Sequence, residues 1–239
     1  KVDGQALLED LKREFVDADC MEAFMQAASS RRLQAFCFPG ALSQGACKAL
    51  RNVVDSEPLS HSPDSVDSLP EHQRQLPATE AREQLEELIG ARETQRLLSL
   101  PLEFYRAEQR QRRAEKETGT SCEDETGGDD GDESLYPPIF SLQEAFIRRY
   151  SSDSRPFNPF HMDRSHLTVN VALTSSDDHV GGQLLAVQNG RVQVLERAEG
   201  EATLHGSDLL HGVSAMSEGV RYSFLLFFSK RQRPAPSNR

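Results

Sequence analysis

The stretch HMDRSHLTVNVAL, residues 161–173, joins a pair of metal-ligand side chains to a strand-forming run. His161 and Asp163 are two residues apart, so both side chains point to the same face of an extended strand. Alone, such a pair is more typical of a solvated loop than of a metal site. Residues 167–173 are rich in β-branched and apolar side chains, which predicts a strand directly after the pair.

Short β-rich runs continue downstream of this stretch and are separated by Gly, Asp and Ser. Strands in this arrangement are typical of a two-sheet jelly roll. We predict strands at residues 167–173, 183–187, 191–195, 201–204, 209–213 and 220–228. Residues 141–147 before them are predicted as a short helix, and the proline-containing tail from Lys230 as disordered.

The N-terminal half has mainly helical spacing of its apolar residues. We predict a helix within residues 5–29, a strand at 33–38 that ends at Pro39-Gly40, and a helix that begins after Ser43. Residues 56–78 are predicted as a loop. Thr79 is the expected N-cap of the next helix, and Pro101 is expected to end a further one before a basic helix leads into an acidic loop.

These patterns predict an α+β fold, with a two-sheet jelly-roll core and N-terminal helices packed on it. We divide the chain into four regions. They are residues 1–55 (N-terminal helices and first strand), 56–140 (helical insertion with an acidic flexible loop at 117–134), 141–229 (jelly-roll core) and 230–239 (disordered tail).

His211 and Arg221 lie on later predicted strands and complete the pattern that begins at His161. Two histidines and one carboxylate can hold iron on one face and leave the opposite positions free for oxygen and a bidentate co-substrate. Arg221 follows the turn Ser217-Glu218-Gly219, so its strand should pair with that of His211. Its planar guanidinium suits a terminal carboxylate. On its own, Arg221 could equally be a strand charge whose head reaches water.

The composition narrows the class of protein further. A net charge of −11 argues against broad contact with nucleic acid or anionic membrane, and the 37% hydrophobic content includes no run long enough to span a membrane. The four cysteines show no metal-finger or disulfide spacing. We therefore expect a soluble protein. The start at Lys1, with no targeting signal, suggests a piece of a longer protein, and the compartment and oligomeric state stay open.

Residues 145–229 resemble the catalytic domain of procollagen-lysine hydroxylases and, more broadly, the prolyl and lysyl hydroxylase branch of 2-oxoglutarate oxygenases. The segments that carry the resemblance are residues 161–173, Gly181-Gly182, LHGSDLLHG at 204–212 and GVRY at 219–222. A looser match, FPGALSQGAC at 38–47, is similar to the start of that fold.

The resemblance implies that the jelly roll of residues 141–229 is a double-stranded β-helix and the catalytic core, and it implies roles for individual residues. His161, Asp163 and His211 match the iron ligands, and Arg221 matches the residue that binds the C5 carboxylate of 2-oxoglutarate. The positions that would line the same pocket are Thr168, Asn170, Tyr150 and Ser223, the last in phase with Arg221 along its strand. His205 fits the resemblance as a residue that supports a ligand, and His166 and His179 are expected in loops or at the surface.

The expected function is an Fe(II)- and 2-oxoglutarate-dependent dioxygenase that uses O2 and yields succinate, carbon dioxide and a hydroxylated substrate, with ascorbate as a further candidate cofactor. A peptidyl Lys or Pro is the first substrate class, and a small molecule is the alternative. Phe227 stands where AlkB-type demethylases have a second Arg, which disfavours nucleic acid. Two rivals stay open, a non-catalytic interaction module and a cupin-type dioxygenase that does not use 2-oxoglutarate.

Overall fold

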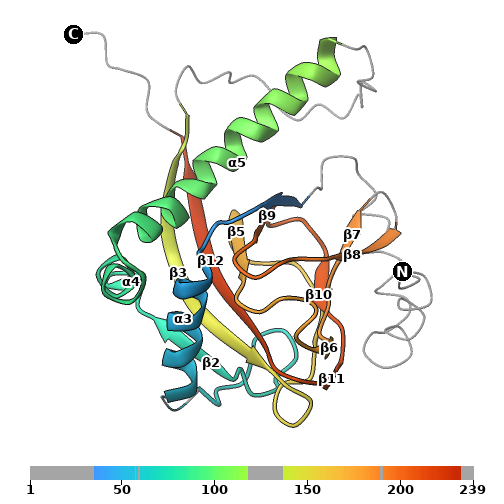
Figure 1. The fold of residues 1–239 in the computed structure, drawn as a ribbon. Helices are drawn as coiled ribbons and strands as arrows, with labels where there is room; N and C mark the ends of the chain where they lie inside the picture. Colours follow the sequence, from blue (N-terminus) through green and yellow to red (C-terminus); the bar gives the residue numbers. More distant parts are fainter. Residues whose placement is uncertain (1–34, 57, 59, 118–136, 189–190, 233–239) are drawn as a thin grey trace.

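The computed structural model describes residues 35–56, 58, 60–117, 137–188 and 191–232 (Figure 1). The helices are α3 (Gln44–Ser56), α4 (Ala81–Ile89) and α5 (Ala91–Glu117). The strands are β1 (Phe36–Phe38), β2 (Gln73–Leu76), β3 (Ile139–Tyr150), β4 (Asn158–His161), β5 (Leu167–Ala172), β6 (Val180–Gly181), β7 (Leu184–Gln188), β8 (Arg191–Leu195), β9 (Ala202–Gly206), β10 (His211–Val213), β11 (Met216–Glu218) and β12 (Arg221–Arg231). No helix among the described residues is both long and apolar enough to cross a membrane.

Most strands belong to two sheets. The larger has six strands in the order β1-β9-β5-β12-β3-β2, and the smaller has four in the order β4-β10-β7-β8. From β3 to β12 the chain passes repeatedly from one sheet to the other, and the pairings that the sheet order gives are antiparallel. This is the two-sheet jelly roll that the strand pattern predicts.

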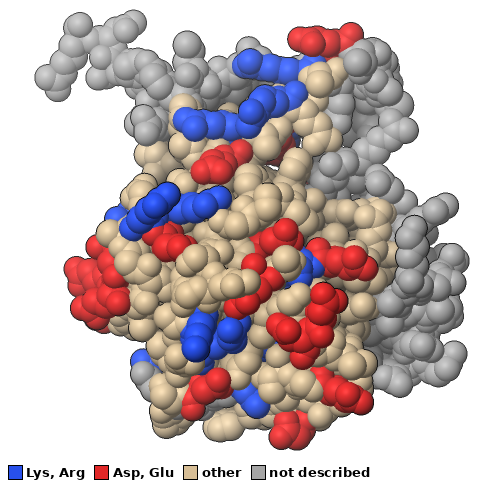
Figure 2. Space-filling view, in the orientation of Figure 1, with Lys and Arg blue, Asp and Glu red and all other residues tan. Residues whose placement is uncertain are grey.

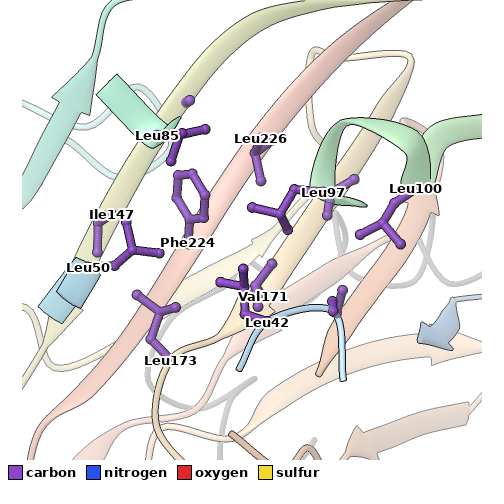
Figure 3. Close-up of a cluster of buried hydrophobic side chains, with 14 of the residues drawn as sticks. Leu42, Leu50, Leu85, Leu97, Leu100, Ile147, Val171, Leu173, Phe224 and Leu226 are labelled. Atoms are coloured by element: carbon purple, nitrogen blue, oxygen red, sulfur yellow. The ribbon is translucent and has the colours of Figure 1, made fainter. Parts of the chain in front are cut away.

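One face of the six-stranded sheet carries the main hydrophobic core, and the helices cover it (Figures 1 and 3). Leu50 from α3, Leu85 from α4 and Leu97 from α5 pack against alternate residues of the strands, such as Val171 and Phe224. Since successive side chains on a strand point to opposite faces, the residues between these apolar positions face the interior of the jelly roll.

The β-strands predicted for the C-terminal half are present, with ends shifted by three residues at most. Ser43 also precedes its helix as expected, and its hydroxyl accepts a hydrogen bond from the backbone N–H of Ala46 at 3.3 Å. Strand β12 runs to Arg231, two residues into the predicted tail, because it pairs with β3 as far as Ile139. The predicted helix within residues 5–29 and most of the predicted acidic loop lie outside the described residues.

The prediction of a helix at residues 141–147 is wrong, because these residues form the middle of β3. Local spacing allowed a helix, but β3 pairs with β12 along its length and with β2 on its other side. Ala145 and Ile147 are fully buried in the main core. Tertiary pairing therefore overrides local preference here, and it also turns residues 73–76 of the predicted loop into β2.

Two predicted helix ends are also wrong. Helix α5 continues through Pro101, with Leu97, Leu100 and Phe104 buried along one side. Burial of this stripe outweighs the one backbone hydrogen bond that the proline removes. The N-cap of α4 is Glu80 rather than Thr79, and it makes no side-chain capping bond.

Candidate metal centre and anion pocket

His161, Asp163 and His211 come together where the ends of two neighbouring strands of the smaller sheet meet. His161 ends β4 and His211 begins β10, and the two residues are direct partners in the antiparallel pairing. Asp163 follows β4 by two residues. One ligand atom from each of the three side chains lies within 4.8 Å of the others, so the cluster can hold one metal ion.

The hydrogen bonds of the histidines fix which ring nitrogen faces the cluster. Nδ1 of His161 lies 2.8 Å from the carbonyl oxygen of Pro159, and Nδ1 of His211 lies 3.0 Å from that of Leu209. A carbonyl can only accept, so each Nδ1 is the donor and each Nε2 keeps its lone pair. These Nε2 atoms lie 3.4 and 3.7 Å from the carboxylate of Asp163. Lone pairs and a carboxylate that converge in this way favour a bound cation.

The pKa values of the cluster suit metal ligation at neutral pH. Burial by itself would raise the pKa of Asp163, but attraction to the surrounding imidazoles, His211 foremost, outweighs it and places the pKa below its ordinary value. Burial lowers the pKa of His211 to about 3, although Asp163 acts to raise it. The carboxylate is therefore ionised and the His211 imidazole neutral, which is the protonation state that a metal ligand requires.

Two residues of the larger sheet contact the same carboxylate. The hydroxyl of Thr168 on β5 donates a hydrogen bond to Asp163 at 2.5 Å, so it orients the carboxylate. His205 on β9 is buried, and its Nε2 lies 3.7 Å from the Asp163 carboxylate. Its ring centroid is 4.5 Å from that of His211. His205 thus sits beside the predicted ligands, a place compatible with the supporting role expected from the sequence.

Arg221 begins β12, directly opposite Tyr150 of β3, on the face of the larger sheet that turns away from the helices. The predicted pairing of this strand with that of His211 is wrong, because β12 pairs with β3 and β5 while β10 belongs to the smaller sheet. It is 3% exposed, and burial lowers the pKa of its guanidinium. The guanidinium lies over the Tyr150 ring, 4.7 Å from the centroid. Neither Nη1 nor Nη2 has a hydrogen-bond partner among the described residues. A buried cation with unused donors marks a site for an anion.

The other predicted pocket residues lie on the same interior face. Ser223 pairs with Ala172 of β5, and its buried hydroxyl has no partner among the described residues. Asn170 lies one inward-facing position before Ala172. The small side chain of Ala172 takes up little room between Asn170 and Ser223, so this part of the sheet can form the floor of a pocket.

Arg197, which the sequence did not single out, also reaches this floor. It lies between β8 and β9, is 6% exposed, and donates from Nη1 to the side-chain oxygen of Asn170 at 2.9 Å. A second bond runs from the same nitrogen to the backbone oxygen of Asn170 at 3.0 Å. An arginine in a turn between two strands gives no pattern from which this contact could be predicted.

A buried ion-pair network supports the start of β4 from the other side. Arg155 is fully buried and binds Asp67 through both guanidinium ends, at 3.0 and 3.1 Å. It also donates to the side chain of Asn158 at 2.8 Å. Asn158 in turn lies 3.5 Å from Nε2 of His161. The segment around Asp67 is therefore tied to the strand that carries a predicted ligand.

His166 and His179, which the sequence placed in loops or at the surface, lie apart from the cluster, and so does the glycine pair Gly181-Gly182. Nδ1 of His179 lies 2.8 Å from the carbonyl oxygen of Gly181, and His166 is exposed next to β5. Gly182 has a positive φ of 63°, and a Cβ there would come within 3.2 Å of the Arg221 side chain. The Gly181-Gly182 pair thus permits a backbone course close to Arg221 that larger residues would obstruct.

No protein-family model and no curated protein matches this sequence. Solved structures of similar fold include an oxidoreductase of the 2OG-Fe(II) oxygenase family from Burkholderia pseudomallei (TM-score 0.51, 16% identity, 89% of this chain and 92% of the other). Another is a prolyl hydroxylase from Trichoplax adhaerens in complex with a hypoxia inducible factor peptide fragment (0.52, 13%, 90% and 94%). A third is AviO1 from Streptomyces viridochromogenes Tue57 (0.53, 13%, 90% and 97%).

At these identities the similarity concerns the fold. The chain has the jelly-roll fold found in 2-oxoglutarate/Fe(II) oxygenases. Prolyl hydroxylases are among the proteins that share it.

Proposed function

We propose that this protein is an Fe(II)- and 2-oxoglutarate-dependent dioxygenase that hydroxylates a substrate C–H bond. The observation that carries the proposal is the pairing of two features inside one jelly roll. One is the cluster of His161, Asp163 and His211, whose lone pairs converge. The other is the buried guanidinium of Arg221, whose two terminal nitrogens have no partner among the described residues.

The spacing along β5 supports the same reading. Thr168, which donates to Asp163, and Ala172, which pairs with Ser223 near Arg221, are four residues apart. In an extended strand this separation is about 13 Å. Asp163 and a bound metal at one end, and the Arg221 side chain at the other, would take up much of this span, so a five-carbon dicarboxylate could lie between them with its keto acid end at the metal and its far carboxylate at the guanidinium.

In this proposal the side chains hold and orient, and the metal supplies the redox chemistry. Bound Fe(II) would provide the site for O2 activation coupled to decarboxylation of the keto acid. His161 and His211 would ligate through Nε2, while their Nδ1–H bonds to backbone carbonyls keep both rings oriented. Arg221 would fix the far carboxylate. One oxygen atom would end in succinate and the other in the hydroxyl group of the product, with release of carbon dioxide.

A peptidyl Lys or Pro is the proposed substrate class, with a small molecule as the alternative. The structure from Trichoplax adhaerens contains a bound peptide, which supports a peptide substrate on this fold. On the face drawn in Figure 2, acidic and basic side chains are interspersed below α5, so the charge of this face does not favour a basic segment over an acidic one. Kinship with procollagen-lysine hydroxylases, use of ascorbate and the four-region division of the chain are parts of the same proposal.

The two rivals make different use of the same residues. A non-catalytic interaction module would have no need of a complete His-Asp-His cluster with protonation states suited to a metal. A cupin-type dioxygenase would leave the buried Arg221 without a ligand, at a cost in stability. Of the three candidates, only the 2-oxoglutarate-dependent enzyme uses the His-Asp-His cluster and the buried Arg221 together.

The experiment measures succinate release with Fe(II), O2 and 2-oxoglutarate, together with 2-oxoglutarate binding, for wild type and Arg221→Ala. We expect metal-dependent succinate release by the wild type. For the variant we expect at least a roughly 100-fold loss of 2-oxoglutarate affinity, because a charge-assisted bidentate contact disappears. Arg82→Ala, which removes an exposed arginine that contacts Glu86 of α4 and Gln95 of α5, is the matched control.

The outcomes separate the candidates. Metal binding without 2-oxoglutarate binding would favour the cupin-type enzyme. The absence of both would favour the interaction module. Equal activity of wild type and Arg221→Ala would overturn the assignment of Arg221.

A further inference from the structure

Arg197 is a second buried arginine on the pocket side of the larger sheet, and no described acidic side chain pairs with it. Its guanidinium makes hydrogen bonds only to Asn170 among the described residues, both of them from Nη1. The two buried arginines away from the pocket, Arg155 and Arg148, both pair with carboxylates. Arg155 binds Asp67, and Arg148 lies 2.7 Å from the carboxylate of Asp64.

The charge environment of Arg197 includes Arg221. Burial lowers the pKa of Arg197 to about 9, and the positive charge of Arg221 is the next largest contribution. The group therefore stays a cation at neutral pH. Two buried cations that act on each other without an acidic partner are unfavourable in the ligand-free protein. An anion between or beside them would relieve that cost.

Asn170 connects the two cations to the predicted pocket. It lies on β5 between Thr168, which contacts Asp163, and Ala172, which pairs with Ser223. Arg197 fixes both the backbone oxygen and the side-chain oxygen of Asn170. With its oxygen engaged in this way, the Asn170 side chain is held in place and its amide N–H groups remain as possible donors to a ligand.

We propose that Arg197 is a second cation of the co-substrate pocket, and that it binds the far carboxylate together with Arg221 while it orients Asn170. This inference rests on the proposed function and adds a specificity residue to it. A ligand with a carboxylate at both ends would use both arginines. A keto acid of the same length without the far carboxylate would use neither.

The test measures dissociation constants with Mn(II) in place of Fe(II), so that no turnover occurs. The ligands are 2-oxoglutarate and 2-oxopentanoate, which lacks the far carboxylate. For Arg197→Gln we expect a roughly 10- to 100-fold weaker affinity for 2-oxoglutarate, the range of a lost charged hydrogen bond. Affinity for 2-oxopentanoate should stay within about twofold. Arg197→Lys keeps the charge without the planar fork and should fall between wild type and Gln.

Arg51→Gln is the matched control. Arg51 contacts Glu199 in the same turn as Arg197 and also the backbone oxygen of Leu173, so it probes this turn without contributing to the pocket face. Its affinity for both ligands should equal that of the wild type. Thermal unfolding of each variant shows whether it is folded, and if Arg197→Gln unfolds, the selective loss is measured on Arg197→Lys.

Equal weakening of both ligands by the Arg197 variants, or no weakening, would overturn the role of Arg197 and leave the proposed function intact. If the wild type binds neither keto acid in the presence of metal, the proposed function itself fails, and the role of Arg197 fails with it.

Discussion

The two faces of the six-stranded sheet are built from the same strands but have opposite chemistry. On the helix-covered face, Val171 of β5 and Phe224 of β12 are fully buried in the main core. On the interior face, their neighbours Asn170 and Ser223 are almost as deeply buried, yet they are polar. Because side chains alternate along a strand, one residue separates a packing position from a pocket position.

The helix-covered face of the sheet stabilises the folded protein, whereas the polar interior face lowers the stability of the ligand-free protein. Apolar burial on the helix side is favourable at every position. Unpartnered donors on the interior side, such as those of Arg221 and Ser223, cost free energy unless a ligand satisfies them. Substitutions on the two faces should therefore separate folding from binding.

The largest effect on folding is expected for Phe224→Ala, which removes a fully buried ring from the helix-covered face. The free energy of unfolding should fall by about 3–5 kcal/mol. Phe227→Ala is the matched control, because Phe227 is only partly buried and makes an edge contact with Phe146 on the other face. Urea unfolding measures both losses, and equal losses would contradict the assignment of stability to one face.

A smaller effect is expected for Thr168→Val, which keeps the shape of the side chain but removes the donor to Asp163. Metal affinity should fall by roughly tenfold, as expected when a group that supports a metal ligand is lost. Titration with Mn(II) measures the change. Thr174→Val, which removes the acceptor for the backbone N–H of Tyr222 instead, should lower stability without a change in metal affinity. Loss of affinity in both variants would argue for a general effect on the sheet.

The smallest effect on folding is expected for Ser223→Ala. Its hydroxyl has no partner among the described residues, so the free energy of unfolding should change by less than about 0.5 kcal/mol in the ligand-free protein. Binding of 2-oxoglutarate should nevertheless weaken by a few-fold. Isothermal titration and urea unfolding of the same sample measure the two quantities, and a loss of stability above 1 kcal/mol would show a structural bond at this position.

The strands of the C-terminal half could be predicted because their signal is local. Residues 167–173 combine β-branched residues with clear limits, and β5 lies within them. Strand β3 could not be predicted, because residues such as Ala145 and Ile147 have a spacing that also suits a helix. Only the long pairing with β12 makes these residues a strand rather than a helix. The helix end predicted at Pro101 was wrong for a similar reason, because burial of Leu97 and Leu100 keeps α5 continuous across the proline.

By itself, the sequence predicted the jelly-roll class and singled out the four positions His161, Asp163, His211 and Arg221, of which the structure brings the first three close enough to hold one metal ion. It could do so because the alternation of side chains and the spacing of metal ligands are properties of the chain. The tertiary structure decided the contacts around these positions, namely those of His205 and Thr168 with the Asp163 carboxylate, and it added Arg197, which binds Asn170. Such contacts join strands and turns distant in sequence, and only the packing of the two sheets and their turns brings them together.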